Sequence, residues 1–166
     1  MRREKMNNKG FSLVELIIVI AIMAILSAAL APQLMKYIEK SRVSTDDSSC
    51  TSIETCVNAA LAEEAVYKQL AEAGGAGNLV FNVDFSSADA MPSDGSNITM
   101  EVGTGAFDKL VTELASSLGS LKAPKQTGMK YYVIEVESAL DSASGTTQLG
   151  KIKVYTKSTK QTATTF

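Results

Sequence analysis

The sequence has no histidine and no tryptophan, and only two cysteines and three prolines among its 166 residues. Without histidine, the chain cannot form a Ser/His arrangement for nucleophilic catalysis, and its scattered acidic residues match no metal-ligand spacing. Its glycines do not follow the spacing of a phosphate-binding loop. We therefore expect no enzyme activity, no metal ion and no other cofactor.

Charge is also missing from a long stretch near the N-terminus, because no charged residue lies between Leu16 and Met35. A helix of about 20 mostly apolar residues is long enough to cross a membrane. Glu15 directly precedes this stretch. Inserting a carboxylate at the bilayer centre costs about 2.5 to 3.5 kcal/mol, and this penalty falls toward the end of a span. The many Leu, Ile, Val and Phe residues outweigh that cost, so we expect insertion.

A short basic leader precedes the apolar stretch and sets its orientation. Four basic residues stand against the single acid Glu4. They are Arg2, Arg3, Lys5 and Lys9. Positive charge stays on the cytoplasmic side of a membrane, so the chain is predicted to span it once, with its N-terminus inside and its C-terminus outside.

Simpler explanations of this segment account for less of the pattern. A plain membrane anchor gains nothing from Glu15. A secretory signal would be cleaved at a small-x-small site, and residues 29–31 read Ala-Leu-Ala, but Pro32 follows and disfavours that cut. Glu15 could also lie near the headgroups and reach water, although carboxylates inside membrane segments usually have a functional partner.

The segment from Lys9 to Glu15 reads KGFSLVE, and it resembles the prepilin cleavage motif of type IV pilins and pseudopilins. The motif combines a basic leader, a Gly-Phe junction, a glutamate four residues later and a long apolar run. The resemblance is close over residues 9–40 and architectural after them. It implies that a dedicated membrane peptidase cuts after Gly10 and that the new N-terminal Phe11 is N-methylated.

The same resemblance gives Glu15 and Pro32 their expected roles. Pro32 matches the helix-breaking proline of many such pilins, and a proline inside a helix removes one backbone donor and crowds the preceding turn. A kink or local melting is therefore predicted at Pro32. Glu15 matches the assembly carboxylate. It is expected to form a salt bridge with the cationic amine of Phe11 on a neighbouring subunit, which would set the register of the subunits.

Three segments follow from this interpretation: a cleaved leader over residues 1–10, a membrane and filament-core helix over residues 11–40, and a globular head over residues 41–166. Removing the leader leaves 12 basic residues against 17 acidic ones, so the mature chain is mildly acidic. The residues after Lys40 are enough for a single hydrophobic core.

Helical periodicity continues from Tyr37 to about Ala73, so one long helix is predicted from Phe11 to Ala73. Its second half is amphipathic, with Asp46 among the acids placed on the polar face. The glycines of residues 74–77 are expected to end it. The apolar stripe comprises Val43, Cys50, Ile53, Val57, Ala60, Leu61, Tyr67 and Leu70.

The remainder of the chain alternates in the manner of strands, with one further helix. Strands are predicted over residues 79–85, 98–102, 130–137 and 151–156, a helix over 106–118, and a Ser/Gly/Thr-rich loop over 138–150. This order predicts an α+β fold, in which a small antiparallel sheet packs on the second half of the long helix. Type IV pilins have that architecture.

The two cysteines, Cys50 and Cys56, lie on the same predicted helix. Six residues correspond to a rotation of about 240°, so their side chains cannot bridge within a regular helix. Cys50 is expected to be a small buried hydrophobe, and an intermolecular bond of Cys56 is left open. Many pilins of Gram-negative bacteria close a C-terminal loop with a disulfide. The absence of any cysteine after Cys56 points instead to a Gram-positive source.

The last strand and tail carry a basic edge formed by Lys151, Lys153, Lys157 and Lys160. Such an edge could touch nucleic-acid phosphates. Lysines that protect an exposed sheet edge are commoner, so nucleic-acid binding is not expected.

The sequence therefore predicts a structural subunit, favoured as the major pilin, of a type IV pilus that polymerises through its apolar helix. The predicted partners are further copies of the chain, the prepilin peptidase, the pilus assembly machinery and the cytoplasmic membrane. After assembly the fimbria lies at the cell surface, with adhesion and twitching motility among its candidate roles. One alternative is a pseudopilin of a type II secretion or competence system. Another is a membrane-anchored extracellular binding module that does not polymerise.

Overall fold

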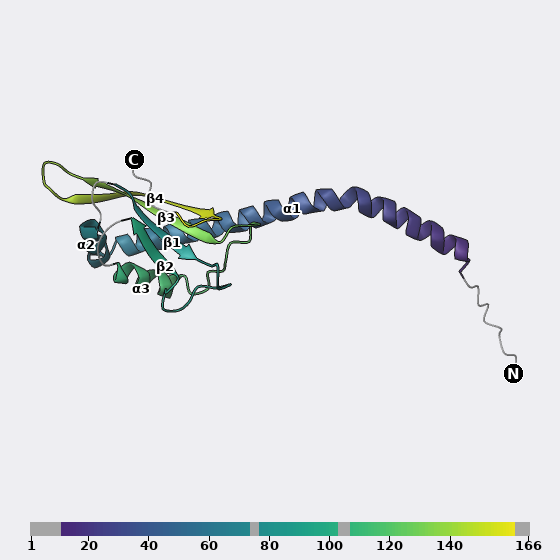
Figure 1. Cartoon of the computed structure of the whole chain (residues 1–166), viewed down its shortest axis with the longest axis horizontal. Coiled ribbons are helices and arrows are strands. Elements are labelled where there is room, and N and C mark those ends of the chain that lie inside the picture. The colour runs from purple at the N-terminus through teal and green to yellow at the C-terminus, as the bar shows by residue number, and fades with distance from the viewer. Residues whose placement is uncertain (1–10, 74–76, 103–106, 162–166) are drawn as a thin grey trace, which may run out of the picture. The chain divides into compact units, whose positions relative to one another are not determined.

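A computed structural model describes residues 11–73, 77–102 and 107–161 (Figure 1). The predicted leader over residues 1–10, residues 74–76 of the predicted helix stop, and Ala106 lie outside the described residues. The chain divides into an N-terminal unit that ends at Lys40 and a C-terminal unit that begins at Ser41.

The N-terminal unit contains the first part of helix α1, which runs over Leu13–Leu61. Pro32 lies inside this helix, and helical structure continues on both sides of it. The local melting considered at Pro32 is therefore not observed, and the kink stays a prediction.

The helix predicted to run to Ala73 is divided in two, because α1 ends at Leu61 and α2 covers Glu64–Ala73. The N–H of Glu63 donates to the carbonyl of Ala60 at 3.1 Å, which tightens the last turn. Ala60 and Val66 are both buried, yet six residues in one continuous helix would turn them about 240° apart. The break lets both side chains face the same core.

The C-terminal unit contains a four-stranded sheet in which every neighbouring pair is antiparallel. Its strands are β1 over Leu79–Asp84, β2 over Ile98–Val102, β3 over Tyr131–Leu140 and β4 over Thr147–Lys157, in the order β2-β1-β3-β4. Helix α3, over Asp108–Ser117, lies between β2 and β3 in the chain. The predicted α+β fold with a small antiparallel sheet is confirmed.

The core lies between one face of the sheet and the helices. Alternate residues of β1 and β3 point to this face, because side chains in a strand alternate between its two sides. The helices contribute Ile53 and Val57 from α1, Val66 and Leu70 from α2, and Leu110 and Leu114 from α3. The sheet contributes Leu79, Phe81, Val83, Tyr132, Ile134, Val136 and Ile152.

The loop predicted over residues 138–150 is mostly strand. Beyond Val136, β3 no longer pairs with β1, but Ser138 to Leu140 still pair with Leu149 to Thr147 of β4. Residues 138–149 thus form a two-stranded hairpin end, here called the distal ribbon, which projects beyond the other strands (Figure 1). At its tip the Asp141 carboxylate accepts hydrogen bonds from the N–H of Ala143 at 2.9 Å and the hydroxyl of Ser144 at 2.8 Å.

Candidate functional site

The first part of α1 exposes large apolar side chains around its whole circumference. The exposed fraction ranges from 43% for Val19 to 73% for Leu13. Burial of apolar surface is the main favourable term in folding, so this stretch requires an apolar environment that its own side chains do not provide. The helix is long and apolar enough to cross a membrane by length and composition. The exposed residues include Leu13, Leu16, Ile17, Ile18, Ile20, Ile22, Met23, Ile25, Leu26, Leu30, Leu34 and Met35.

Glu15 lies in the first turn of α1, where its carboxylate accepts the backbone N–H of Ser12 at 2.9 Å. Ser12 precedes the first helical residue, Leu13, and the spacing Ser-x-x-Glu is that of a capping box. A negative charge at this end of a helix is also favoured by the helix dipole. The sequence interpretation assigned Glu15 a partner only on a neighbouring subunit, whereas the structure provides one within its own segment. The Ser-x-x-Glu spacing was the signal that could have identified it.

The predicted site residues are therefore only partly placed. Gly10 lies outside the described residues. Phe11 is 88% exposed and directly precedes the cap residue Ser12, so Phe11 and Glu15 lie at the same end of α1. Pro32 lies farther along the same helix.

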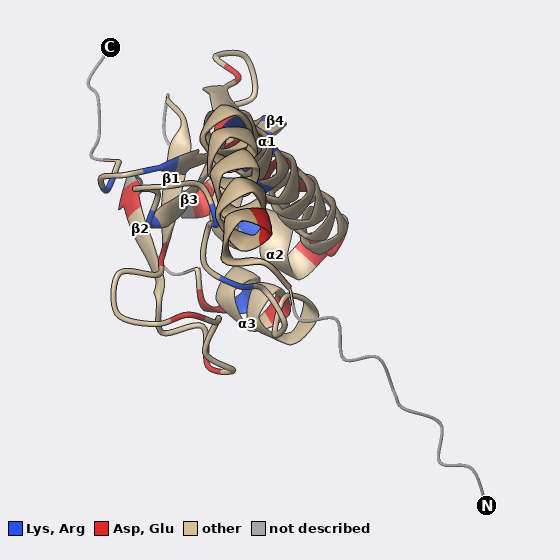
Figure 2. Ribbon diagram, turned by 90° about the vertical axis from the view of Figure 1, so that its right-hand side faces the viewer, with Lys and Arg blue, Asp and Glu red and all other residues tan. Residues whose placement is uncertain are grey.

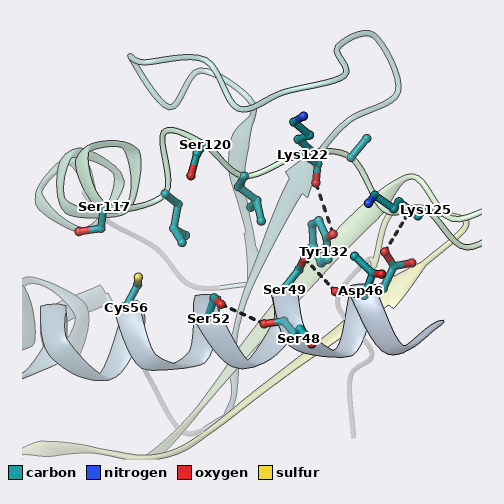
Figure 3. Close-up of a pocket in the computed structure, with 14 residues that line it drawn as sticks. Asp46, Ser48, Ser49, Ser52, Cys56, Ser117, Ser120, Lys122, Lys125 and Tyr132 are labelled. Atoms are coloured by element: carbon teal, nitrogen blue, oxygen red, sulfur yellow. Dashed lines mark hydrogen bonds between the residues drawn. The ribbon is translucent and has the colours of Figure 1, made fainter. Parts of the chain in front are cut away.

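The C-terminal unit has a polar groove between α1 and the chain that follows α3, with a volume of about 500 Å³ (Figure 3). Hydroxyl groups dominate its walls. On α1 these hydroxyls donate to carbonyls four residues earlier, as Ser48 does to Ser44 at 2.9 Å and Ser52 to Ser48 at 2.9 Å. The protons of the α1 hydroxyls are thus used within the helix. Its hydroxyl-bearing residues are Thr45, Ser48, Ser49, Ser52, Ser117, Ser120 and Tyr132.

Burial raises the pKa of the thiol and phenol groups in and beside this groove. Burial raises the pKa of the Cys50 thiol to about 11, with Asp47 and Asp46 adding to the effect. Burial also raises the pKa of Cys56, which lines the groove, and the pKa of Tyr132 to about 12. A thiol is nucleophilic only as the thiolate, so neither cysteine is prepared for catalysis. Within the described residues, no group of acidic residues and cysteines could hold a metal ion.

The predicted basic edge of β4 is partly neutralised by acidic side chains. Lys160 forms an ion pair with Glu101 of β2, and Lys153 lies opposite Glu135 of β3. Lys153 and Lys157 both lie over the ring of Tyr155, at 5.6 and 5.9 Å from its centre. Figure 2 shows both signs of charge interspersed over α2, α3 and the sheet.

Asp46 is the buried residue that the sequence interpretation missed. It was placed on the polar face of the helix, but only 2% of it is exposed. One carboxylate oxygen accepts the N–H of Lys125 at 2.7 Å, and the other accepts that of Gln126 at 2.8 Å. These contacts tie α1 to the segment that leads into β3, so the role of Asp46 is structural.

An exposed apolar helix with a carboxylate at its start, joined in sequence to an α+β head, defines a protein anchored by a single N-terminal helix. Comparison with known proteins gives the family. Residues 5–31 match the family model described as the prokaryotic N-terminal methylation motif. The type IV major alpha-pilin of Moraxella bovis is 32% identical over 113 residues, which cover 68% of this chain and 69% of that protein. The chain belongs to the type IV pilin family.

Other relatives match over a shorter length. The type IV major fimbrial protein FimA of Dichelobacter nodosus is 51% identical over 53 residues, which are 30% of this chain and 34% of that protein. The prepilin peptidase-dependent protein A of Clostridium perfringens is 40% identical over 63 residues, or 37% of this chain and 45% of that protein. The chain thus spans between a third and a half of the length of these two relatives. No solved structure matches the chain.

Proposed function

We propose that this chain is the precursor of a structural subunit, the major pilin, of a type IV pilus. The observation that carries the proposal is the apolar surface of α1, which is exposed all round and begins at a carboxylate. Such a helix is stable in lipid before assembly and among other copies of itself after assembly. The names of relatives that include a major alpha-pilin and a major fimbrial protein support the major subunit.

In this function the N-terminal segments of the chain act one after another. The leader over residues 1–10 directs the chain N-terminus inward, and the prepilin peptidase cuts after Gly10. Phe11 then becomes the methylated N-terminus. The printed name of the Clostridium relative, a prepilin peptidase-dependent protein, supports this step. Residues 11–40 hold the subunit in the cytoplasmic membrane with residues 41–166 outside, and the division of the chain at Lys40 supports that boundary.

Assembly then gives Glu15 a second partner. Cleavage converts the peptide nitrogen of Phe11 into a cationic amine, and the Glu15 carboxylate of an adjacent subunit neutralises it as the helices bundle. Removing one member of a buried ion pair costs about 3 to 5 kcal/mol, because the other charge is left without compensation. The pair therefore disfavours packings that are out of register. The assembly machinery in the membrane supplies the energy of extraction, and the chain itself performs no catalysis.

Mass spectrometry of the N-terminus of sheared surface fibres tests this proposal. Wild-type protein should begin at Phe11 and carry one added methyl group on its terminal amine. Gly10→Ala should block or slow the cut and leave the uncut chain in the membrane, whereas Asn8→Ala, a control in the same leader, should be processed normally. Surface protein that still begins at Met1, or that begins at Pro32, would exclude the proposal. Abundant long fibres would distinguish a pilin from a pseudopilin.

A further inference from the structure

The face of the sheet opposite the core is partly buried, although the helices cover the other face. Tyr132 and Ile134 point into the core, so Val133 between them points outward. Val133 pairs with Asn82 of β1 on one side and Tyr155 of β4 on the other. Both Val133 and Asn82 are 0% exposed. Something other than a helix therefore covers the middle of this outer face.

The segment after β4 provides the cover. Strand β4 ends at Lys157 on one edge of the sheet, and four residues later Gln161 is bonded to Asn82 in β1. Because β3 lies between β4 and β1, the chain must cross β3 to reach Asn82, and Val133 lies in the same row. Residues 158–161, here called the C-terminal strap, thus pass over Val133.

The Asn82 side chain holds the strap as a paired strand would. Its amide nitrogen donates to the backbone carbonyl of Gln161 at 3.0 Å, and its amide oxygen accepts the backbone N–H of Gln161 at 3.1 Å. A side-chain amide offers the same donor and acceptor as a peptide group, and this reciprocal exchange is the pattern of an antiparallel pair. Both bonds use the backbone of Gln161, so its side chain is not required for them.

Two further contacts fix the ends of the strap. Lys160 forms an ion pair with Glu101 of β2, and the ammonium group of Lys157 donates to the side-chain oxygen of Gln161. The strap therefore connects β4 at one edge of the sheet to β2 at the other edge. Both cysteines of the chain lie on α1 and are free, so no disulfide makes this connection.

We propose that the C-terminal strap is a non-covalent clasp that closes the outer face of the head, with Asn82 as its receptor group. The closed clasp joins the two sheet edges and keeps Val133 from solvent. The open clasp exposes an apolar strip beside an unpaired amide on the face that carries no helix. The two hydrogen bonds between Asn82 and Gln161 hold the middle of this face closed, and the contacts of Lys157 and Lys160 hold the ends of the strap.

The clasp is tested with three variants of the full-length protein in detergent micelles. Gln161→Pro removes the N–H that Asn82 accepts, and it changes a residue outside the sheet. Gln161→Ala keeps both backbone bonds to Asn82, removes only the side-chain contact with Lys157, and is the matched control. Asn82→Ala removes the receptor group from within β1. Thermal unfolding of the head and hydrogen exchange of the Gln161 amide are the two measurements.

Gln161→Pro and Asn82→Ala should each lower Tm by about 3 to 8 °C, while Gln161→Ala should stay within about 2 °C of the wild type. In Asn82→Ala the Gln161 amide should exchange at least about tenfold faster, because its protection comes from local closure. If Asn82→Ala fails to fold, Gln161→Pro still decides the matter. A wild-type Tm for Gln161→Pro, or an equal loss for Gln161→Ala, would overturn the proposal.

Discussion

Asp46 and Lys125 lie 79 residues apart in the chain, yet the carboxylate of Asp46 accepts the backbone N–H of Lys125 at 2.7 Å. Its second oxygen accepts the N–H of Gln126 at 2.8 Å. The carboxylate is thus satisfied by two backbone donors, and hydrogen bonds to an ionised acceptor are stronger than neutral ones. This contact fixes the segment before β3 against α1 at a point where the polar groove limits apolar packing.

Replacing Asp46 should destabilise the head. Asp46→Ala leaves two backbone N–H groups without their acceptors, and we expect a loss of about 2 to 4 kcal/mol in the free energy of unfolding. Asp46→Asn keeps one acceptor and should lose less. Asp47→Ala is the control, because Asp47 is exposed on the same turn and should change stability by about 0.5 kcal/mol or less. Thermal unfolding of the three variants measures these differences, and equal stability of Asp46→Ala and Asp47→Ala would contradict the assignment.

A second prediction concerns two glycines with positive φ. Gly95 has φ of 63°, and a Cβ atom there would lie 2.5 Å from Cγ1 of Val111 on α3. Gly145 has φ of 67°, but a Cβ atom there would meet no atom within 4 Å. Gly145→Ala should therefore cost only backbone strain, about 1 kcal/mol. Gly95→Ala adds a steric overlap and should cost about 2 to 4 kcal/mol in unfolding free energy. Similar losses for the two variants would show that the Val111 side chain on α3 moves aside without a cost in stability.

A third prediction concerns thiol reactivity. The thiolate is the reactive form, and with a pKa of about 11 Cys50 should react about a hundredfold more slowly at pH 8 than an ordinary exposed cysteine thiol. Cys56 should be alkylated first, and mass spectrometry of partly alkylated native protein measures the order. Cys56→Ala should abolish the fast phase.

Reductant should leave the Tm of the head unchanged, whereas a drop of more than about 10 °C would reveal a disulfide.

A fourth prediction follows from Tyr132, whose pKa is raised from 10.0 to about 12 mainly by burial. Between these two values the unfolded chain loses the phenol proton while the folded chain keeps it. The free energy of unfolding must then fall as pH rises. The contribution of Tyr132 is fully present below pH 10 and is lost progressively toward pH 12. Tyr132→Phe should remove this part of the alkaline loss, although it deletes the hydroxyl contact to the Lys122 carbonyl at 3.4 Å. Tm measured from pH 7 to 11.5 in both proteins tests the prediction; parallel curves would contradict it.

The fifth prediction concerns Glu15. Glu15→Leu should favour membrane insertion by up to about 2.5 to 3.5 kcal/mol, although it removes the acceptor of the Ser12 N–H. Cleavage after Gly10 should continue, because it depends on the junction. Assembly should fail, since the amine of Phe11 would enter the fibre without its counter-charge. The yield of sheared fibres from cells that make only the variant measures this. Glu15→Gln removes the charge and keeps the shape of the side chain, and normal fibre yields of both variants would show that assembly does not need this carboxylate.

Local patterns predicted the elements whose side chains alternate strongly. Residues 79–85 and 98–102 alternate apolar and polar residues, and β1 and β2 occupy almost the same positions. The apolar spacing that predicted a helix over 106–118 likewise matches α3 at Asp108–Ser117. These elements are stabilised by packing one face against the core, and such packing leaves a periodic signature in sequence.

Other features depend on contacts that periodicity does not encode. The helix break after Leu61 is indicated only by the six-residue spacing between Ala60 and Val66. This spacing does not fit one face of a single helix, and the predicted apolar stripe did not take it into account. The distal ribbon has little apolar patterning, and polar contacts support it: its two strands pair with each other, and the N–H of Leu149 donates to the hydroxyl of Tyr67 on α2 at 3.1 Å. Asp46 and Asn82 look like ordinary surface residues until segments about 79 residues away supply their partners.

The distal ribbon also has a consequence for what this protein can tolerate. Between Ser138 and Leu149 the two strands of the hairpin pair with each other. The turn at its tip is stabilised by local hydrogen bonds to the Asp141 carboxylate. Neither the core nor the Asn82 clasp draws on residues 141–146. Foreign sequence placed at this tip, such as an epitope or a binding peptide, would be presented to solvent while the head keeps its fold.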